Sequence, residues 1–166
     1  MRRFVALWIC VAACSPAPRA ELTTASEALV APVAAYGFEE GSGSTTADSS
    51  GNGLTGTLTA TTWTSSGKFG KALSFNGSSS WVTVPDANAL DLTIGMTVMA
   101  WVKPTTLSGW TELVYKECPG GFSYALYANA GTNQPNVSYG ISDGTERNLS
   151  AGTMLPMGSW THVAGT

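Results

Sequence analysis

Short segments in which apolar and polar residues alternate follow one another along the chain from residue 33 onward. In one of them, Val98, Ala100 and Val102 fall on one side and Trp101 on the other, as in a half-buried β-strand. Turn residues separate the segments at intervals of about ten positions, a spacing that is typical of all-β sandwiches and barrels. The pattern therefore predicts an all-β fold with no substantial helix.

The predicted strands share this alternation and are bounded by clusters rich in Gly, Asn, Ser or Pro. They cover residues 33–38, 54–60, 71–77, 81–85, 96–104, 111–116, 122–128, 136–142 and 160–165, with a single helical turn at 87–92. The last strand stops in mid-pattern. Because an unpaired edge strand is a liability for a native domain, we expect the chain to be incomplete at its C-terminus.

The composition narrows the class of protein. Charged residues make up only 11% of the chain, against about a quarter in an average protein. Ser, Thr and Gly take their place, as is typical of extracellular β proteins with many glycine turns. The net charge is −3, and no Lys/Arg cluster occurs beyond Arg2 and Arg3. A nucleic-acid partner is therefore not expected.

Residues 1–20 are predicted to be an export signal. Two arginines precede an apolar stretch at 4–13, which is too short to span a bilayer. Residues 11–14, Val-Ala-Ala-Cys, resemble a bacterial lipobox, in which the cysteine becomes the lipidated N-terminus, so Cys14 is the predicted lipidation site. An ordinary secretory signal cut a few residues later and an uncleaved anchor remain alternatives. The prediction is a bacterial outer-membrane or cell-surface lipoprotein, or a secreted protein, that meets the membrane only through a lipid anchor.

The remainder divides into a tether and one domain. Residues 15–32 are rich in Pro, Ala and Thr and read as a linker. Residues 33–166 carry all the predicted strands and are long enough for one domain with a core. Cys118 has no obvious disulfide partner and no nearby histidine, so a catalytic thiol is not expected.

Four motifs in this domain point to a family. They read AAYGFEEGSGSTTADSSGNGLTGTL, W-x5-FGKALSFNGSSSWVTVP, LDLTIGMTVMAWVKP and GSWTHVAGT. In order and spacing they resemble the laminin-G-like jelly-roll domain of the concanavalin A-like lectin/glucanase superfamily, over roughly residues 33–166. The resemblance implies two antiparallel sheets packed face to face. It also implies a C-terminally truncated domain, because relatives normally continue beyond the last of these motifs.

The loop Asp48–Gly56, DSSGNGLTG, has two interpretations. In one, Asp48 forms an Asx turn and the glycines supply positive φ angles for a tight loop. In the other, the loop helps to hold Ca²⁺, with oxygens from Glu39, Asp48, Gly51 and Asn52, since a hard cation takes six to eight oxygen ligands. Many domains that this one resembles carry a structural calcium at about this edge. Both interpretations remain open from the sequence.

The later strands carry side chains suited to recognising sugars, because rings stack on sugar faces and amides bond to hydroxyls. The candidate binding residues are Trp110, Tyr115, Tyr124, Tyr127 and Tyr139, with Asn133, Asn136 and Asp143 at the rim. A glycan-binding face requires at least two coplanar aromatic rings exposed on one side. Burial of the same rings favours a protein-interaction or spacer domain instead.

Catalytic residues are not expected. The glucan-cleaving relatives place acidic residues on one strand in the pattern Glu-x-Asp-x-(x)-Glu, and this chain lacks that pattern. Glu39 and Glu40 are adjacent and would point to opposite faces of a strand. The single histidine, His162, has no nucleophile motif beside it. The sequence thus predicts a non-catalytic extracellular module that binds a glycan or a protein, with calcium as a candidate stabilising ion. The alternative is an accessory domain of a larger secreted glycoside hydrolase or other hydrolase.

Overall fold

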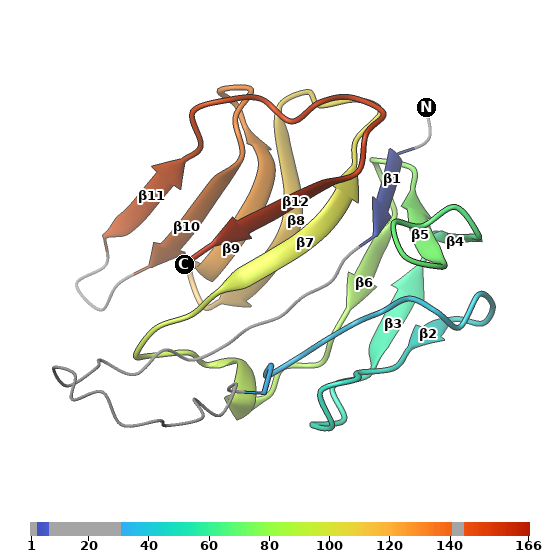
Figure 1. The fold of residues 1–166 in the computed structure, drawn as a ribbon. Helices are drawn as coiled ribbons and strands as arrows, with labels where there is room; N and C mark the ends of the chain where they lie inside the picture. The colour runs from blue at the N-terminus through green and yellow to red at the C-terminus, as the bar shows by residue number, and fades with distance from the viewer. Residues whose placement is uncertain (1–2, 7–30, 141–144) are drawn as a thin grey trace, which may run out of the picture.

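The chain folds into three antiparallel β-sheets, shown in Figure 1, in a computed structural model that describes residues 3–6, 31–140 and 145–166. The strands are β1 (Arg3–Ala6), β2 (Thr45–Thr46), β3 (Gly56–Thr59), β4 (Thr62–Thr64), β5 (Ala72–Phe75), β6 (Trp81–Thr83), β7 (Val98–Lys103), β8 (Trp110–Cys118), β9 (Gly121–Ala130), β10 (Asn136–Gly140), β11 (Glu146–Ser150) and β12 (Thr161–Gly165). Sheet A has the order β12-β7-β1-β5-β4, sheet B β2-β3-β6, and sheet C β11-β10-β9-β8.

Sheets A and C pack face to face, with β7 and β12 lying across β9 and β10 in Figure 1. The core between them holds Val102 of β7, Val163 of β12, Leu126 of β9 and Val137 of β10, all buried. Sheet B extends the core sideways through partly buried residues such as Val82. The predicted antiparallel β-sandwich is confirmed, and within the described residues a short 3-10 turn is the one helical element found.

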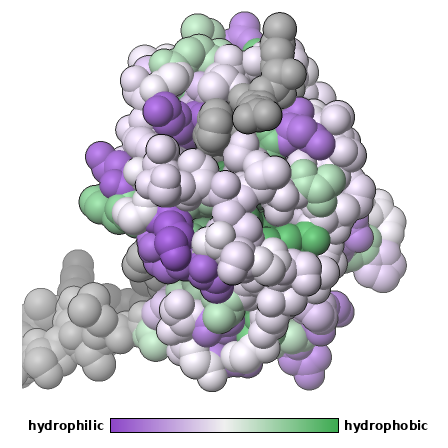
Figure 2. Space-filling view, turned by 90° about the vertical axis from the view of Figure 1, so that its right-hand side faces the viewer, coloured by the Kyte–Doolittle hydropathy of each residue, from purple (hydrophilic) through white to green (hydrophobic). Residues whose placement is uncertain are grey.

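The alternation that predicted the strands is reproduced where a strand covers the core. In β7, Val98, Ala100 and Val102 are buried, while Met99 and Trp101 are only half-buried. The helical turn expected at 87–92 is a 3-10 turn at Asn88–Leu90. Figure 2 shows a surface on the side of β2 to β5 with mostly intermediate hydropathy, as the many Ser, Thr and Gly residues lead one to expect.

The strand predicted at 33–38 is wrong. Ala34, Ala35 and Tyr36 are all buried in succession, so the segment does not alternate between core and solvent. The amide of Ala35 donates to the side chain of Asp48 instead of to a neighbouring strand, and Phe38 has a φ of 55°. The segment therefore contributes its rings to the core without joining a sheet.

The alternating sequence pattern did not predict three short strands. Strands β2 and β4 have only two and three residues, too few to show a period. Strand β11, Glu-Arg-Asn-Leu-Ser, is exposed along its whole length. It is a strand because its backbone pairs with β10 from Gly140↔Glu146 to Asn136↔Ser150, and not because one of its faces is buried.

Strand β1 comes from the predicted export signal. Its backbone pairs antiparallel with β5 on one side, where Val5 lies opposite Leu73. On the other side it pairs antiparallel with β7, where Val5 lies opposite Val102. Strands β5 and β7 therefore run parallel to each other with one strand between them. This pairing does not test the export prediction, but it makes Arg3–Ala6 a strand of sheet A in the full chain. Among the described residues, no helix is long and apolar enough to cross a bilayer.

Gly165 sets the separation between the two packed sheets. A Cβ at this position would lie 2.5 Å from the Cβ of Val137 on the facing sheet, and a buried β-branched side chain has little freedom to move away. We expect Gly165→Ala to lower the free energy of unfolding by about 1–3 kcal/mol through overpacking, measured by chemical denaturation. Gly152→Ala is the control, since a Cβ there meets nothing within 4 Å. Equal stability of the two variants would contradict the close approach of the sheets.

Candidate binding face

The candidate site is the side of sheet C that faces away from sheet A, called here the outer face of sheet C. In β9, Tyr124, Leu126 and Ala128 belong to the core between the sheets. The residues between them, Ala125 and Tyr127, therefore point to the opposite side. The β-sheet register places the other outward residues opposite these two: Glu112 and Tyr115 on β8, Asn136 and Ser138 on β10, and Asn148 and Ser150 on β11.

An irregularity in β8 aims its side chains at this face. The pairing with β9 shifts register between Thr111 and Glu112 and again between Glu112 and Val114. Leu113 and Val114, although adjacent, both pack against the core. An extra residue in a strand re-aims the residues that follow it. Glu112 and Tyr115 consequently share the outer face although their spacing is not even.

Two aromatic clusters lie on β8 and β9. The rings of Trp110 and Tyr127 meet edge to face, with centroids 5.2 Å apart and planes at 73°. Trp110 is 60% exposed, whereas Tyr127 is buried. Further along β8, the half-exposed ring of Tyr115 contacts Phe122 at 5.5 Å with planes at 41°. Trp110 is thus largely exposed to solvent while its ring is in contact with Tyr127.

A row of amides and hydroxyls crosses β10 and β11 beside these rings. The side-chain amide of Asn136 donates to the hydroxyl of Ser150 at 3.0 Å. The hydroxyl of Ser138 lies within hydrogen-bonding distance of two amide oxygens, those of Asn136 at 2.7 Å and of Asn148. Because one hydroxyl proton serves only one acceptor at a time, an acceptor on this row is left for another donor. Asn148 and Ser150 are exposed, so their remaining donors and acceptors face solvent, whereas Asn136 and Ser138 are buried.

Tyr127 is a buried residue of the outer face whose surroundings shift the pKa of its hydroxyl. Burial, together with smaller contributions from Tyr115, Glu112 and Glu146, raises the pKa of its hydroxyl to about 12. Its side chain is nearly enclosed, at 5% exposure. No hydrogen bond to its hydroxyl is found among the described residues. Tyr127 therefore stays a neutral donor in neutral solution, with two carboxylates in its vicinity.

The predicted binding residues divide between several places. Trp110, Tyr115, Tyr127 and Asn136 come together on the outer face. Tyr124 does not: its ring is in the core and its hydroxyl donates to the carbonyl of Leu90 at 3.2 Å. The inclusion of Tyr124 is corrected on this ground, since alternation gives it the opposite side from Tyr127.

Three further predicted residues lie off the face or outside the described chain. Tyr139 is 40% exposed but lies on the side of β10 that it shares with Val137, opposite to Asn136. Asn133 is in the turn between β9 and β10, with a φ of 62°, and its backbone amide donates to the side chain of Asn129. Asp143 lies outside the described residues. Trp110 and Tyr115 are both exposed, as a glycan-binding face requires. The ring pairs on this face are edge-on or tilted, however, so no coplanar pair is seen among them.

Sequence reasoning missed Glu112, Ser138, Glu146, Asn148 and Ser150. For the residues of β10 and β11, the signal was the spacing i, i+2, which places Asn136 with Ser138, and Asn148 with Ser150, on one side. That signal was hidden for β11 because the strand itself was not recognised.

The loop at Asp48 is held together by the aspartate itself. One carboxylate oxygen accepts the backbone amides of Ala35 at 3.0 Å and Ser50 at 2.9 Å. The other accepts the Ser50 hydroxyl at 2.7 Å and the Leu54 amide at 3.1 Å. Burial opposes ionisation, but these hydrogen bonds outweigh it and hold the pKa of Asp48 below its usual value. The predicted Asx turn is therefore present, through the bond from the Ser50 amide.

The remaining candidate calcium ligands make other contacts. The Glu39 carboxylate accepts the backbone amide of Lys71 at 3.2 Å, and the Lys71 ammonium donates to the Glu39 carbonyl at 2.8 Å. The side chain of Asn52 donates to the carbonyl of Val33 at 2.8 Å. No group of three or more acidic, His or Cys residues fit to hold a metal occurs among the described residues. These contacts do not supply a ready donor set for Ca²⁺, and calcium binding stays a prediction.

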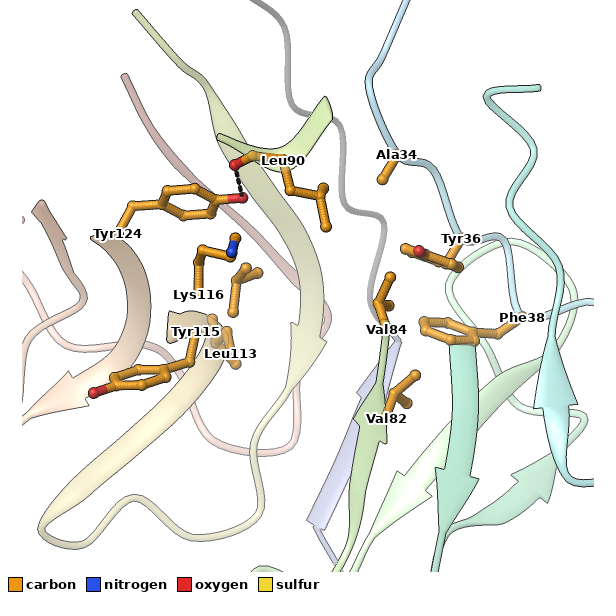
Figure 3. A pocket seen from close by; sticks show the side chains of 11 residues that line it. Ala34, Tyr36, Phe38, Val82, Val84, Leu90, Leu113, Tyr115, Lys116 and Tyr124 are labelled. Carbon is orange, nitrogen blue, oxygen red and sulfur yellow. Dashed lines mark hydrogen bonds between the residues drawn. The ribbon is translucent and has the colours of Figure 1, made fainter. Parts of the chain in front are cut away.

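A separate cavity of about 150 Å³ lies between sheets B and C, away from the outer face (Figure 3). Its walls are mainly apolar side chains, among them Val82 and Val84 on one side and Leu113 on the other. Figure 3 shows the ring of Tyr115 turned away from this cavity, as expected for an outer-face residue. The cavity is a gap in the sandwich core, where the edge strands β6 and β8 do not pair with each other.

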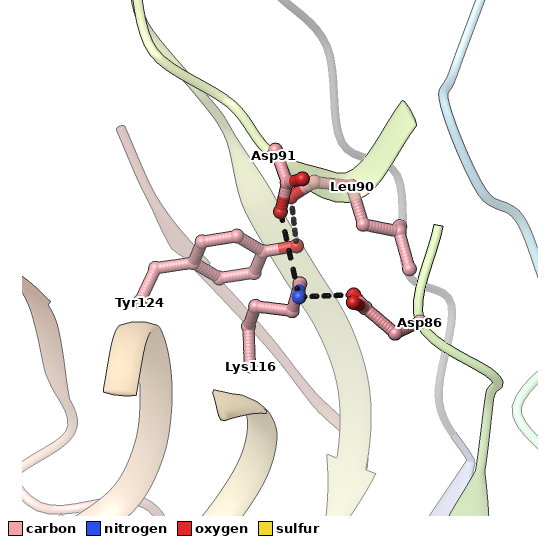
Figure 4. A network of polar contacts seen from close by, with 5 residues as sticks. All are labelled: Asp86, Leu90, Asp91, Lys116 and Tyr124. Atoms are coloured by element: carbon pink, nitrogen blue, oxygen red, sulfur yellow. Dashed lines mark hydrogen bonds and ion pairs between the residues drawn. The ribbon is translucent and has the colours of Figure 1, made fainter. Parts of the chain in front are cut away.

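A polar network closes one side of that cavity (Figure 4). The ammonium of Lys116 lies 2.5 Å from a carboxylate oxygen of Asp86 and 3.5 Å from one of Asp91. The hydrogen bond from Lys116 lowers the pKa of Asp86, and the same bond raises the pKa of Lys116. Since Lys116 is held by two carboxylates, it has little capacity to attract an anionic ligand into the cavity.

Comparison with known proteins identifies the family. The profile of the concanavalin A-like lectin/glucanases superfamily, in its laminin-G form, matches residues 76–166, which is more than half of the chain. No curated protein and no solved structure matches the chain. The matched region includes β6 to β12 and so carries the whole of the outer face of sheet C. The chain belongs to the laminin-G-like branch of the concanavalin A-like lectin/glucanase superfamily.

Proposed function

We propose that this chain is a non-catalytic module that binds glycans on the outer face of sheet C. Domains of its family commonly bind carbohydrates or proteins. The observation that favours a carbohydrate is the exposed indole of Trp110, in contact with Tyr127, on the same face as the exposed Asn148 and Ser150. A sugar has an apolar C–H face and a rim of hydroxyls, and this arrangement offers a partner for each.

The spacing of the carboxylates favours binding over hydrolysis. Glycoside hydrolysis uses two carboxyl groups roughly 5–9.5 Å apart. Glu112 is on β8 and Glu146 on β11, with β9 and β10 between them. Neighbouring strands are about 4.8 Å apart, so the two backbones are separated by about 14 Å or more. Glu112 and Glu146 are thus poorly placed to act together on one glycosidic bond.

The experiment is calorimetric titration of the full chain with neutral oligosaccharides selected on a glycan array. Trp110→Ala is expected to weaken binding at least tenfold, about 1.4 kcal/mol, because it removes the exposed stacking surface. Tyr139→Ala is the matched control, since it removes an exposed ring from the opposite face of the same sheet. No binding by the array glycans, or equal losses in the two variants, would contradict the proposal.

We also propose that the module is displayed outside the cytoplasm through lipidation at Cys14. The support is the sequence of residues 1–14, with its arginines, its short apolar stretch and its lipobox-like end. In a bacterial host, the wild-type chain should incorporate a labelled fatty acid and partition into membranes, whereas Cys14→Ser should not. Secretion of an unlipidated wild-type chain would favour the ordinary secretory signal instead.

A further inference from the structure

We propose that the cavity between sheets B and C is a binding site for a small neutral hydrocarbon group about the size of a benzene ring. This site is separate from the outer face of sheet C and goes beyond the proposed glycan binding. The proposal rests on the volume of the cavity, on its mainly apolar walls and on the pairing of the polar side chains in those walls.

The walls of the cavity come from segments that lie far apart in the sequence. Figure 3 shows them facing one another, with Tyr36, Phe38, Val82 and Val84 on one side and Leu113 on the other. Val82 and Val84 are only half-buried although they pack against the core. They therefore retain apolar surface that a ligand can cover, and removing such surface from water is favourable.

The volume of the cavity, about 150 Å³, suits a ring of about six carbon atoms. In another protein, an engineered apolar cavity of about this volume stays free of water and binds benzene or xenon. A void without atoms also loses the dispersion contacts that its walls would otherwise make. A ring that fills the space restores those contacts, so size and chemistry favour the same ligand.

The hydroxyl groups in the walls are already paired within the protein. The hydroxyl of Tyr36 donates to the carbonyl of Leu54, and that of Tyr124 donates to the carbonyl of Leu90 at 3.2 Å. In the described part of the chain, the one buried side-chain polar atom without a hydrogen bond is Thr111 Oγ1, which is not in these walls. Since a firmly held water needs two to four polar partners, the walls favour an apolar occupant.

The charged groups at the cavity disfavour an anionic ligand. The ammonium of Lys116 joins β8 to Asp86 and Asp91, which lie in the segment between β6 and β7 (Figure 4). An anion therefore meets an ammonium that two carboxylates already hold, and its own charge would lose hydration among apolar walls. A neutral ring has no such cost, so the site should discriminate between a neutral ring and the same ring with a carboxylate.

The test is calorimetric titration of the full chain with benzene and, separately, with benzoate. Benzene is expected to bind and benzoate is not. Leu113→Phe extends a ring into the cavity from β8 and should weaken benzene binding by about tenfold or more, because the space is then filled. Leu149→Phe is the matched control, since it makes the same substitution at an exposed position of β11. Val84→Phe fills the cavity from the opposite wall and should have the same effect as Leu113→Phe.

Crystals of the full chain under xenon gas give a second readout that needs no variant. One xenon atom is expected among Val82, Val84 and Leu113. The proposal is wrong if no xenon enters the cavity, if benzoate binds as tightly as benzene, or if both cavity-filling variants bind benzene as the wild type does. Trp110→Ala should leave benzene binding unchanged, so failure here is distinguishable from failure of the glycan proposal.

Discussion

Removal of residues 1–20 is expected to lower the stability of this chain sharply. The deletion takes away β1, which pairs with β5 on one side and β7 on the other. Two ladders of backbone hydrogen bonds lie in the middle of sheet A, and each net bond contributes about 1 kcal/mol. With three or more bonds lost, the free energy of unfolding should fall by about 3 kcal/mol or more. Urea denaturation of the full chain and of the chain from Glu21 measures the difference.

Two point variants separate the loss of β1 from the loss of chain length. Val5→Pro keeps the length but removes one backbone donor from the middle of β1 and should reproduce much of the destabilisation. Ala20→Pro adds a proline to a segment that already contains several and should have little effect. If the chain from Glu21 is as stable as the full chain, then Arg3–Ala6 does not contribute to the fold as its pairing suggests.

Cleavage of the export signal would remove β1 from the middle of sheet A. If the signal is cleaved as its sequence predicts, the exported chain has β5 and β7 without the strand that lies between them here. Two parallel strands one strand apart form a slot with hydrogen-bonding edges on both sides. The exported form would then have to fill or close this slot, so its stability and that of the full chain need to be measured separately.

Much of the fold follows from the period of two in the sequence. That period identified β7, β9, β10 and β12, because each of these strands has one side in the core. It failed at 33–38, where a run of buried residues follows an irregular path, and at β11, where no residue is buried. Patterning detects burial on one side of a strand, and strands that are held only by backbone pairing give no such signal.

The binding face was only partly predictable for the same physical reason. The aromatic residues were visible in the sequence, but their sides of the sheet depend on the register shifts in β8. Tyr124 and Tyr127 are three residues apart and point to opposite faces, so one packs in the core and the other belongs to the site. The polar row needs β11 as a partner for β10, and this pairing joins residues that no local motif connects.

Asp48→Ala is expected to be the most damaging change in the loop that opens the domain. The carboxylate accepts four hydrogen bonds, from the amides of Ala35, Ser50 and Leu54 and from the Ser50 hydroxyl. Alanine leaves these donors without their acceptor, next to a core that contains Tyr36 and Leu54. Since Asp48 is only partly buried, water replaces some of these bonds, and we expect a loss of about 2–3 kcal/mol in the free energy of unfolding. Thermal or urea unfolding at neutral pH measures it.

The pH dependence of this loss identifies its cause. The folded chain holds the pKa of Asp48 below its usual value, so the unfolded chain binds the proton more readily. The stabilisation is complete above the unfolded pKa of about 3.9 and is lost as the pH falls through the folded value. The difference between wild type and Asp48→Ala should therefore shrink below about pH 4. Asp86→Ala, which removes a fully exposed carboxylate, should cost much less at neutral pH. A difference for Asp48→Ala that does not change with pH would mean that the carboxylate charge is not what holds the loop.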